Sequence, residues 1–285
     1  MKVAVLTDSA AIIDLQLKDK LKIKILPLPL LANGKVYYEK YYYDRKNLYE
    51  MLNQPKAFLT TGQVSTSAIQ ETINRLVENN YTDVICIHVA NSISGLGDNL
   101  RSFAQKQNQI KMHIIDSYSF GTAEGNLAVL AARLVNSGVS LNQIKLEVQS
   151  VRSQSQTLII MKNLNHLATL GYVKNGLSVM EKTLFKPKTL MNFGASGRLQ
   201  VINTYAQLNR LFRAIRWQIA PAYQEMTGEL RIEITAVRTA QNDRFIRRLL
   251  SGLQRVFPVA KIQLHDMPLS MIGQIGKESI VISWN

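Results

Sequence analysis

The strongest constraint on the fold is the regular alternation of short apolar runs with longer amphipathic runs in residues 1–150. The apolar runs favour strands at 2–6, 83–89 and 111–115. Helical periodicity appears between and after them, at 67–79, 99–106 and 123–136. Strands that alternate with helices are typical of βαβ units and a mostly parallel sheet. We therefore predict an N-terminal α/β domain with a mostly parallel sheet flanked by helices.

Two local signals refine this prediction. Pro27 and Pro29 exclude a helix over 23–30 and place that extended segment at a sheet edge or outside a ladder. Ser67 and Gln70 form a capping-box pair that predicts the start of the helix at 67–79.

The pattern changes after residue 150. Residues 231–237 alternate apolar and polar side chains, and further strand patterns lie at 157–162, 259–265 and 279–284. Helical patterns lie at 206–219 and 240–257. We predict an α+β domain with a largely antiparallel sheet over 151–285, and a domain boundary near residue 150.

Composition excludes several classes of protein. Hydrophobic residues make up 46% of the 285 residues and charged residues 19%, which excludes a disordered chain and a coiled coil. The single cysteine, Cys86, excludes a disulfide framework, and its apolar neighbours predict a buried, inert thiol. The apolar run at 127–135 is too short to cross a bilayer. The N-terminal sequence lacks the pattern of a signal peptide, so we expect a soluble, cytoplasmic protein.

The net charge of +14 is unevenly distributed. Residues 1–150 carry 16 Lys and Arg against 13 Asp and Glu, whereas residues 151–285 carry 18 against 7. This asymmetry is compatible with an acidic partner or an anionic surface for the second domain, and equally with a solvated basic face.

Signatures of catalysis are absent from the sequence. No phosphate-binding loop is present, and Gly95-Leu96-Gly97 is only a fragment of a dinucleotide fingerprint. The four histidines are widely separated and show no metal-ligand spacing. Asp8 and Asp116 could be paired carboxylates, but the sequence does not place them at the separation that glycoside hydrolysis requires. We expect no cofactor, no metal and no enzymatic activity.

Hydroxyl side chains recur where the predicted strands end. Thr7-Asp8-Ser9, Ser92 with Ser94, and Asp116-Ser117 each follow a strand, and Thr60-Thr61 precedes a helix. The carboxyl ends of parallel strands form one crevice where ligands bind, and helix starts favour anions. Ser, Thr and Asp are also the preferred helix caps, so the pattern leaves both capping and a ligand site open.

These motifs resemble those of the DegV family, the fatty-acid-binding proteins of bacterial fatty-acid kinases. VAVLTDSAAI at 3–12 is similar to the family's opening strand and TDS turn, and 61–65 (TGQVS) to its TSQPS loop. Residues 90–95 (ANSISG) resemble the SSGLSG loop, and 114–117 (IIDS) with Gly121 and Gly125 resemble the V-I-D-S segment. Lys186-Pro187 and Gly197 match the KP…G stretch. The resemblance runs almost from end to end.

The resemblance implies a long-chain fatty acid in an apolar tunnel between the two domains. The threonine of TSQPS and a serine of SSGLSG would hold the carboxylate. Here that threonine is Thr61, and the serine position is Asn91 without a gap or Ser92 with a one-residue gap. The strand-end residues Ser9 and Ser117 complete the candidate ligand-binding set. A partner kinase would then phosphorylate the carboxylate.

Two departures from the family pattern concern the kinase. Tyr172 stands where the family's L…GGRI segment has an arginine implicated in kinase contact. Gln274 stands at the histidine of the family's HVGPG segment; glutamine still donates a hydrogen bond but cannot become cationic.

An alternative interpretation is a lipid-binding or regulatory module without kinase hand-over. Its basic second domain would meet an anionic membrane or nucleic acid. Two helices supply the arginines, at positions 210, 213, 216, 244, 247, 248 and 255. The absence of interleaved aromatics and of a known nucleic-acid motif argues against nucleic acid. An enzyme that uses Asp8 and Asp116 is a third interpretation, without a base or cofactor signature.

Overall fold

The computed structural model describes residues 2–39, 50, 52, 59–162, 164, 167–168, 170–171 and 187–285. The chain divides into two compact units. Unit 1 comprises Met1–Ser153, Ala195–Arg198 and Pro268–Gln274, and unit 2 comprises the remaining segments. Two short segments of the region that we assigned to the second domain, 195–198 and 268–274, thus belong to unit 1.

Unit 1 contains a four-stranded parallel sheet in the order β2-β1-β6-β7. Its strands are β1 (Val3–Asp8), β2 (Lys24–Leu26), β6 (Asp83–His88) and β7 (Lys111–Asp116). Every residue of β6 is buried, as its apolar run requires for a strand covered on both faces. This sheet confirms the predicted parallel α/β architecture.

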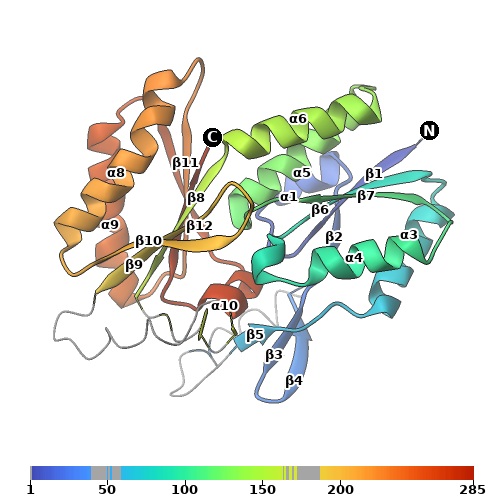
Figure 1. Ribbon diagram of the computed structural model, residues 1–285, viewed down its shortest axis with the longest axis horizontal. Helices are drawn as coiled ribbons and strands as arrows, with labels where there is room; N and C mark the ends of the chain where they lie inside the picture. The colour runs from blue at the N-terminus through green and yellow to red at the C-terminus, as the bar shows by residue number, and fades with distance from the viewer. Residues whose placement is uncertain are drawn as a thin grey trace. The chain divides into compact units, whose positions relative to one another are not determined.

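Helices cover both faces of this sheet. Figure 1 shows α5 (Gly121–Asn136) and α6 (Leu141–Gln154) on one face, and α3 (Thr66–Glu78) and α4 (Leu96–Gln105) on the other. Alternate strand residues, such as Ile85 and Ile87, pack with the buried side chains of α5 and α6. Ile85 and Ile87 lie on the same face of β6, because side chains alternate along a strand, and they join one core with these helices.

A second, three-stranded sheet in unit 1 was not predicted. It has the order β4-β3-β5, with β3 (Pro29–Ala32), β4 (Lys35–Tyr38) and β5 (Leu59–Thr61). The segment 23–30 was predicted to lie at a sheet edge or outside a ladder. β2 is an edge strand and Pro27 lies outside the strands, as predicted, but Pro29 lies in β3, the central strand of this sheet. Pro29 is tolerated there as the first residue of the strand.

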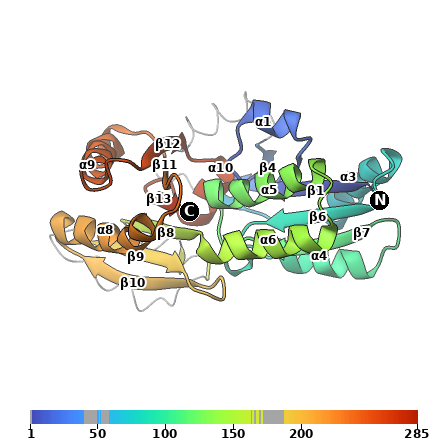
Figure 2. The same ribbon diagram turned by 90° about the horizontal axis from the view of Figure 1, so that it is seen from above.

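Unit 2 contains a six-stranded sheet in the order β10-β9-β8-β13-β11-β12. All pairs are antiparallel except β11 with β12, which confirms the predicted largely antiparallel sheet. Figure 2 shows β8, β9 and β10 side by side. The strands are β8 (Gln156–Met161), β9 (Lys188–Phe193), β10 (Leu199–Tyr205), β11 (Arg231–Ala236), β12 (Lys261–Asp266) and β13 (Ile280–Trp284).

Two long helices pack on the sheet of unit 2. They are α8 (Leu208–Glu225) and α9 (Ala240–Val256). Their apolar faces join one core with strand residues, represented by Ile215 of α8, Leu249 of α9 and Ile234 of β11. The rings of Phe212 and Phe245 lie 5.2 Å apart, so the two helices are in direct contact.

Some element boundaries differ from those predicted. α3 is capped by Ser65, whose hydroxyl accepts from the Ala68 amide, so the predicted cap at Ser67 was wrong by two residues. α8 continues through Pro221 for a further turn. The remaining helices, α1 (Leu15–Lys20), α6, α10 (Leu269–Ile275) and the 3₁₀ turn η1 (Asn91–Ile93), were not predicted.

Candidate functional site at the carboxyl ends of the parallel strands

Two aspartates organise the turns at the carboxyl ends of β1, β6 and β7. Asp8 Oδ1 accepts from the Ala10 amide at 2.9 Å, and Oδ2 accepts from the Val89 amide at 2.8 Å. Asp116 likewise accepts from the amides of Tyr118 and Asn91, at 2.9 and 3.1 Å. Each carboxylate therefore binds backbone amides through both oxygens. This holds the strand-end loops together and does not present a free base.

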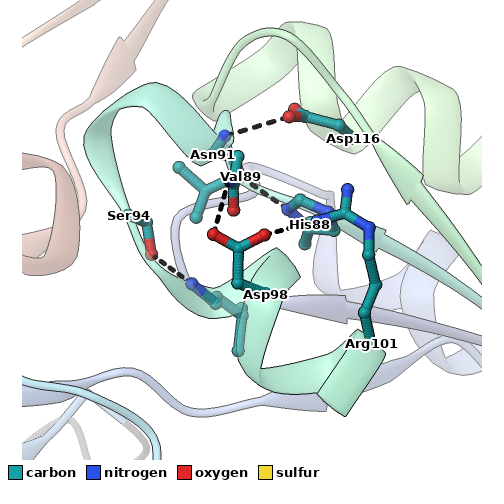
Figure 3. Close-up of polar contacts among 8 residues, drawn as sticks. His88, Val89, Asn91, Ser94, Asp98, Arg101 and Asp116 are labelled. Atoms are coloured by element: carbon teal, nitrogen blue, oxygen red, sulfur yellow. Dashed lines mark hydrogen bonds and ion pairs between the residues drawn. The ribbon is translucent and has the colours of Figure 1, made fainter. Parts of the chain in front are cut away.

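Asn91 lies at the start of η1 and points toward α4 (Figure 3). Its Nδ2 donates to Asp98 Oδ2 at 3.1 Å, and Asp98 also pairs with Arg101 at 2.8 Å. Its Oδ1 is buried and has no hydrogen-bond partner among the described residues, and the same is true of His88 Nε2. Asn91 thus keeps its acceptor uncommitted, while one of the two N–H groups of Nδ2 is used.

The hydroxyls of Ser92 and Ser117 are engaged within unit 1. Ser92 Oγ donates to the carbonyl of Gly197, in the turn between β9 and β10, at 2.7 Å. Ser117 Oγ donates to the carbonyl of Ser119 at 2.9 Å and closes its own turn. A Cβ at Gly197 would lie 2.2 Å from the Tyr118 ring, so only glycine fits beside that turn. Both serines have a structural use.

The start of helix α10 contacts the turn after β1 and the Glu39 side chain. Ser270 Oγ lies 2.9 Å from the carbonyl oxygen of Ser9 and 3.0 Å from Glu39 Oε2. The Glu39 carboxylate also accepts from the amides of Leu269 and Ser270, at 2.7 and 3.2 Å. Ser9 Oγ accepts from the Leu28 amide at 3.0 Å. These bonds fix the start of α10 to the turn after β1.

The next turn of α10 lies against the end of β5. A Cβ at Gly273 would lie 3.0 Å from the carbonyl carbon of Thr60 and 3.2 Å from Thr61 N. That contact is too close for most side chains, so glycine permits the helix to approach Thr61. The hydroxyl of Thr61, which is half-buried, has no hydrogen-bond partner among the described residues.

Gln274 follows Gly273 and is completely buried, at 0% exposure. Neither Nε2 nor Oε1 has a hydrogen-bond partner among the described residues. Buried side-chain amides are nearly always hydrogen-bonded, because burial without a partner costs several kcal/mol at the upper end of measured values. An amide without a partner, one residue after the glycine that lies against Thr61, is therefore the feature of this region that most clearly indicates a ligand.

The loop that carries Thr61 also lies beside the loop after β6. A Cβ at Gly95 would lie 3.8 Å from Gln63 Nε2. The structure thus gathers Ser9, Thr61 and Gln274 around α10 and places Asn91 and Ser92 in the loop next to Gln63. Tyr172 lies outside the described residues, so its role stays a prediction.

A second carboxyl, Glu124 of α5, is buried beside Asp8. Thr7 Oγ1 donates to Glu124 Oε1 at 2.8 Å. Burial, and then the charge of Asp8, raise the pKa of Glu124 well above its ordinary value, and burial raises the pKa of Asp8. The protonated form of Glu124 therefore persists to higher pH than that of an exposed glutamate.

Sequence reasoning missed Glu124, Glu39 and Ser270. Glu124 lies in a segment that reads as an ordinary amphipathic helix, and nothing in its local pattern shows burial. Glu39 and Ser270 are 231 residues apart, so only the tertiary fold reveals their contact. Apolar spacing in 269–275 was the one available signal for α10.

The remaining chemical groups offer little reactivity. Cys86 is buried, as predicted, and burial raises the pKa of its thiol to about 12. Among the described residues, no three His, Cys, Asp or Glu side chains gather closely enough to hold a metal ion. Of the helices in the described parts of the chain, none has the length and apolar character needed to span a membrane.

The structure is similar to several solved proteins. A fatty acid binding DegV family protein from Streptococcus agalactiae superposes with a TM-score of 0.84 at 22% identity, covering 100% of this chain and 98% of the other. A DegV family protein from Eubacterium eligens loaded with heptadecanoic acid gives 0.78 at 15% identity, covering 99% and 98%. The fatty acid kinase B3 protein of Streptococcus pneumoniae loaded with linoleic acid gives 0.78 at 13%, covering 100% and 99%. At these identities the likeness shows the shared fold.

Sequence comparison agrees with the structural one. A DegV domain-containing protein from Streptococcus pyogenes is 24% identical over 276 residues, 96% of each chain. A DegV domain-containing protein from Listeria monocytogenes is 22% identical over 284 residues, 100% of this chain and 98% of the relative. The family model described as "Uncharacterised protein, DegV family" matches residues 2–285. The resemblance inferred from the sequence motifs is thereby confirmed: this chain belongs to the DegV family.

Proposed function

We propose that this protein binds a long-chain fatty acid and holds its carboxylate between Gln274 and Thr61. The observation that carries the proposal is the Gln274 side chain, which is fully buried with neither amide atom hydrogen-bonded by a described residue. A fatty-acid carboxylate would accept from Gln274 Nε2 and from the Thr61 hydroxyl. The close approach at Gly273 places these two residues in adjoining segments.

The energetics favour an acyl ligand at such a site. Each buried methylene contributes about 0.8 kcal/mol, so a long chain supplies most of the affinity. The carboxylate costs several kcal/mol to desolvate unless it receives hydrogen bonds. Two donors, each worth about 1.5–3 kcal/mol toward a charged acceptor, offset that cost. The apolar tunnel that the family resemblance implies for the acyl chain stays a prediction.

Related structures support this class of ligand. Their names record fatty acid binding, and two are described as loaded with heptadecanoic acid or linoleic acid. Chain length and saturation differ between those two ligands. We therefore propose a long-chain fatty acid as the class of ligand.

We further propose that a partner fatty-acid kinase, and not this protein, modifies the carboxylate. The two strand-end aspartates bind backbone amides through both carboxylate oxygens, which argues against a catalytic base at this position.

The decisive experiment combines lipid extraction with substitution of Gln274. The purified protein should release a long-chain fatty acid that mass spectrometry identifies. In Gln274→Leu, which has nearly the same volume, fatty-acid affinity should fall at least tenfold while the lipid-free protein becomes more stable, because a buried unpaired amide is removed.

The matched control is Gln274→His, the residue that the family pattern has at this position. Histidine keeps a donor, so binding should persist. Absence of any bound lipid, together with no fatty-acid affinity after delipidation, would overturn the proposal. Unchanged affinity in Gln274→Leu would leave fatty-acid binding intact but remove Gln274 from the site.

The kinase hand-over needs a separate test at Tyr172. Arginine offers five donors and a permanent charge, whereas tyrosine offers one hydroxyl. With a kinase from a conventional DegV system, Tyr172→Arg should form acyl phosphate faster than the wild type at equal lipid occupancy. A wild type that is already fully competent would show that the departure at this position is neutral.

A further inference from the structure

A groove between α8 and α9 of unit 2 collects three arginine side chains. It has a volume of about 180 Å³, and its lining includes Arg213 and Arg216 of α8 and Arg248 of α9. Phe212, Leu249 and Leu253 also line it, and both leucines are buried in the core beneath the helices. The groove therefore combines an apolar floor with guanidinium groups along its sides.

The two helices run alongside each other in the same direction (Figure 1). The Phe212 and Phe245 rings contact near their first turns, and the Tyr223 and Phe257 rings, 5.0 Å apart, contact at their last. The Arg248 guanidinium lies 5.8 Å from the centre of the Phe212 ring, and Arg216 Nε donates to the Phe212 carbonyl at 3.2 Å. Aromatic and backbone contacts thus orient two of the three arginines.

None of the groove arginines pairs with a carboxylate among the described residues. The described acidic residues of unit 2 that form ion pairs do so elsewhere: Glu229 with Arg231, Glu233 with His265, Asp266 with Arg238, and Glu278 with Lys162. Four more arginines lie exposed on the same two helices, at positions 210, 244, 247 and 255. The two helices carry seven arginines against two acidic residues, Glu225 and Asp243, so the groove lies within a surface of net positive charge.

Guanidinium groups select for phosphate. Each offers a planar fork of donors that matches two oxygens of a phosphate, and it is less strongly hydrated than an ammonium group. Three such forks at one groove give both charge and geometry for a phosphate group. The apolar floor suits a ligand whose phosphate is attached to an organic part.

The exposed apolar residues of this region indicate which kind of ligand carries the phosphate. Trp217, one helical turn after Arg213, is 77% exposed, and Val259, just after α9, is 63% exposed. Tryptophan and arginine together are typical of surfaces that lie at the headgroup level of a bilayer. Single-stranded nucleic acid requires successive aromatic platforms, whereas Trp217 is the only exposed aromatic among the described residues of unit 2.

We propose that the α8–α9 groove binds the phosphate of anionic phospholipid headgroups and docks unit 2 on a membrane surface. Arg213, Arg216 and Arg248 contact the phosphate, and Trp217 lies at the headgroup level. This inference goes beyond fatty-acid binding, and its test is read without fatty acid. It therefore stands or fails separately from the proposed function.

Vesicle flotation with the full chain tests the proposal. We expect binding to vesicles of equal parts phosphatidylcholine and phosphatidylglycerol, no binding to phosphatidylcholine alone, and weakening by salt. Substituting all three groove arginines by Gln should reduce binding on the order of a hundredfold, from the usual contribution of a basic residue at an anionic bilayer. The single substitution Trp217→Ala, in the otherwise wild-type protein, should also reduce vesicle binding.

A matched control removes the same charge from unit 1. Lys20, Lys24 and Lys106 are exposed, and Lys20→Gln, Lys24→Gln and Lys106→Gln together should weaken binding far less than the groove variant. Equal loss in the two variants would overturn the proposal in favour of general charge attraction. Thermal melting of each variant establishes that it is folded.

Two further measurements separate the other sources of phosphate. Inorganic phosphate that binds by calorimetry, with no vesicle binding, would overturn the membrane assignment in favour of a soluble phosphate. Binding of a single-stranded RNA oligonucleotide at lower concentrations than vesicles, lost in the groove variant, would overturn it in favour of nucleic acid. Replacing Arg213 and Arg216 together by Lys keeps the charge and removes the guanidinium fork. This variant should bind vesicles more weakly than the wild type and more strongly than the triple Gln variant.

Discussion

The polar side chains of two regions, one in each unit, differ in whether they have partners within the protein. At the carboxyl ends of the parallel strands in unit 1, Asp8 and Asp116 are tied to backbone amides. On α8 and α9 of unit 2, exposed arginines such as Arg213 and Arg248 have no carboxylate partner among the described residues. The first arrangement fixes loops around a buried site, and the second leaves charge available to a partner.

This contrast predicts very different costs for removing polar groups. The largest effect should come from Asp8→Ala, which leaves the buried amides of Ala10 and Val89 without acceptors. Each unsatisfied buried group costs about 1–3 kcal/mol, so the free energy of unfolding should fall by about 2–6 kcal/mol. Chemical denaturation measures this loss, and the control Glu71→Ala, at an exposed ion pair with Arg75, should cost less than about 1 kcal/mol. Similar losses in both variants would contradict the contrast.

The next effect concerns ligand binding at Thr61. Thr61→Val keeps the shape of the side chain and removes one hydroxyl, so fatty-acid affinity should fall at least tenfold, equivalent to about 1.5–3 kcal/mol. Titration with a fluorescent fatty acid measures it. Thr72→Val is the matched control, since the Thr72 hydroxyl bonds the Ala68 carbonyl within α3. Unchanged affinity and melting in Thr61→Val would make Thr61 a loop residue only.

A third prediction uses the buried carboxyl of Glu124. Because its pKa is raised on folding, the folded chain holds a proton that the unfolded chain has released. Stability should therefore fall as pH rises from the ordinary carboxyl range toward the raised pKa, by up to about 1.4 kcal/mol per pH unit. Asp8, whose pKa is also raised, acts in the same direction.

Glu124→Gln isolates this contribution. Glutamine cannot ionise but can still accept from the Thr7 hydroxyl, so its unfolding free energy should depend less on pH across this window. Denaturation at a series of pH values provides the comparison. Parallel profiles for the variant and the wild type would show that Glu124 is not the group that titrates.

The smallest prediction compares two glycines. A Cβ at Gly252, inside α9, would meet nothing within 4 Å, so Gly252→Ala should raise stability by about 0.5–1 kcal/mol through helix propensity. A Cβ at Gly273 meets backbone atoms of Thr60 and Thr61, so Gly273→Ala should lower both melting temperature and fatty-acid affinity. A higher melting temperature for Gly252→Ala and a lower one for Gly273→Ala would support the contrast between the units. Equal shifts in the two variants would contradict it.

Periodicity predicted most of the architecture because apolar spacing is a local property. The strand at 231–237 and the helix at 240–257 were placed within a residue or two of β11 and α9. The central position of β3 could not be read from the sequence, since a proline at the first position of a strand looks the same at a sheet edge. The cap at Ser65 was missed because Ser67 offered a similar motif two residues later.

The candidate site was predictable only in part. Motif resemblance singled out Thr61 and Gln274, and the structure places them in adjoining segments. Ser92 followed the same motif, yet its hydroxyl donates to Gly197, 105 residues away, which no local pattern shows. Glu39 and Glu124 were missed because burial of a charged residue arises from tertiary packing.

The path of the chain limits how this protein can be divided or assembled. Unit 1 receives α10 only after β8 to β12 of unit 2 have passed in the sequence. During synthesis, a nascent chain that has released only residues 1–153 therefore lacks Gln274 and the turn at Gly197. A genetic exchange at a single junction would separate the strand-end loops from the helix that completes them. The two compact units of this chain are therefore interleaved along its sequence, so no single cut separates one complete unit from the other.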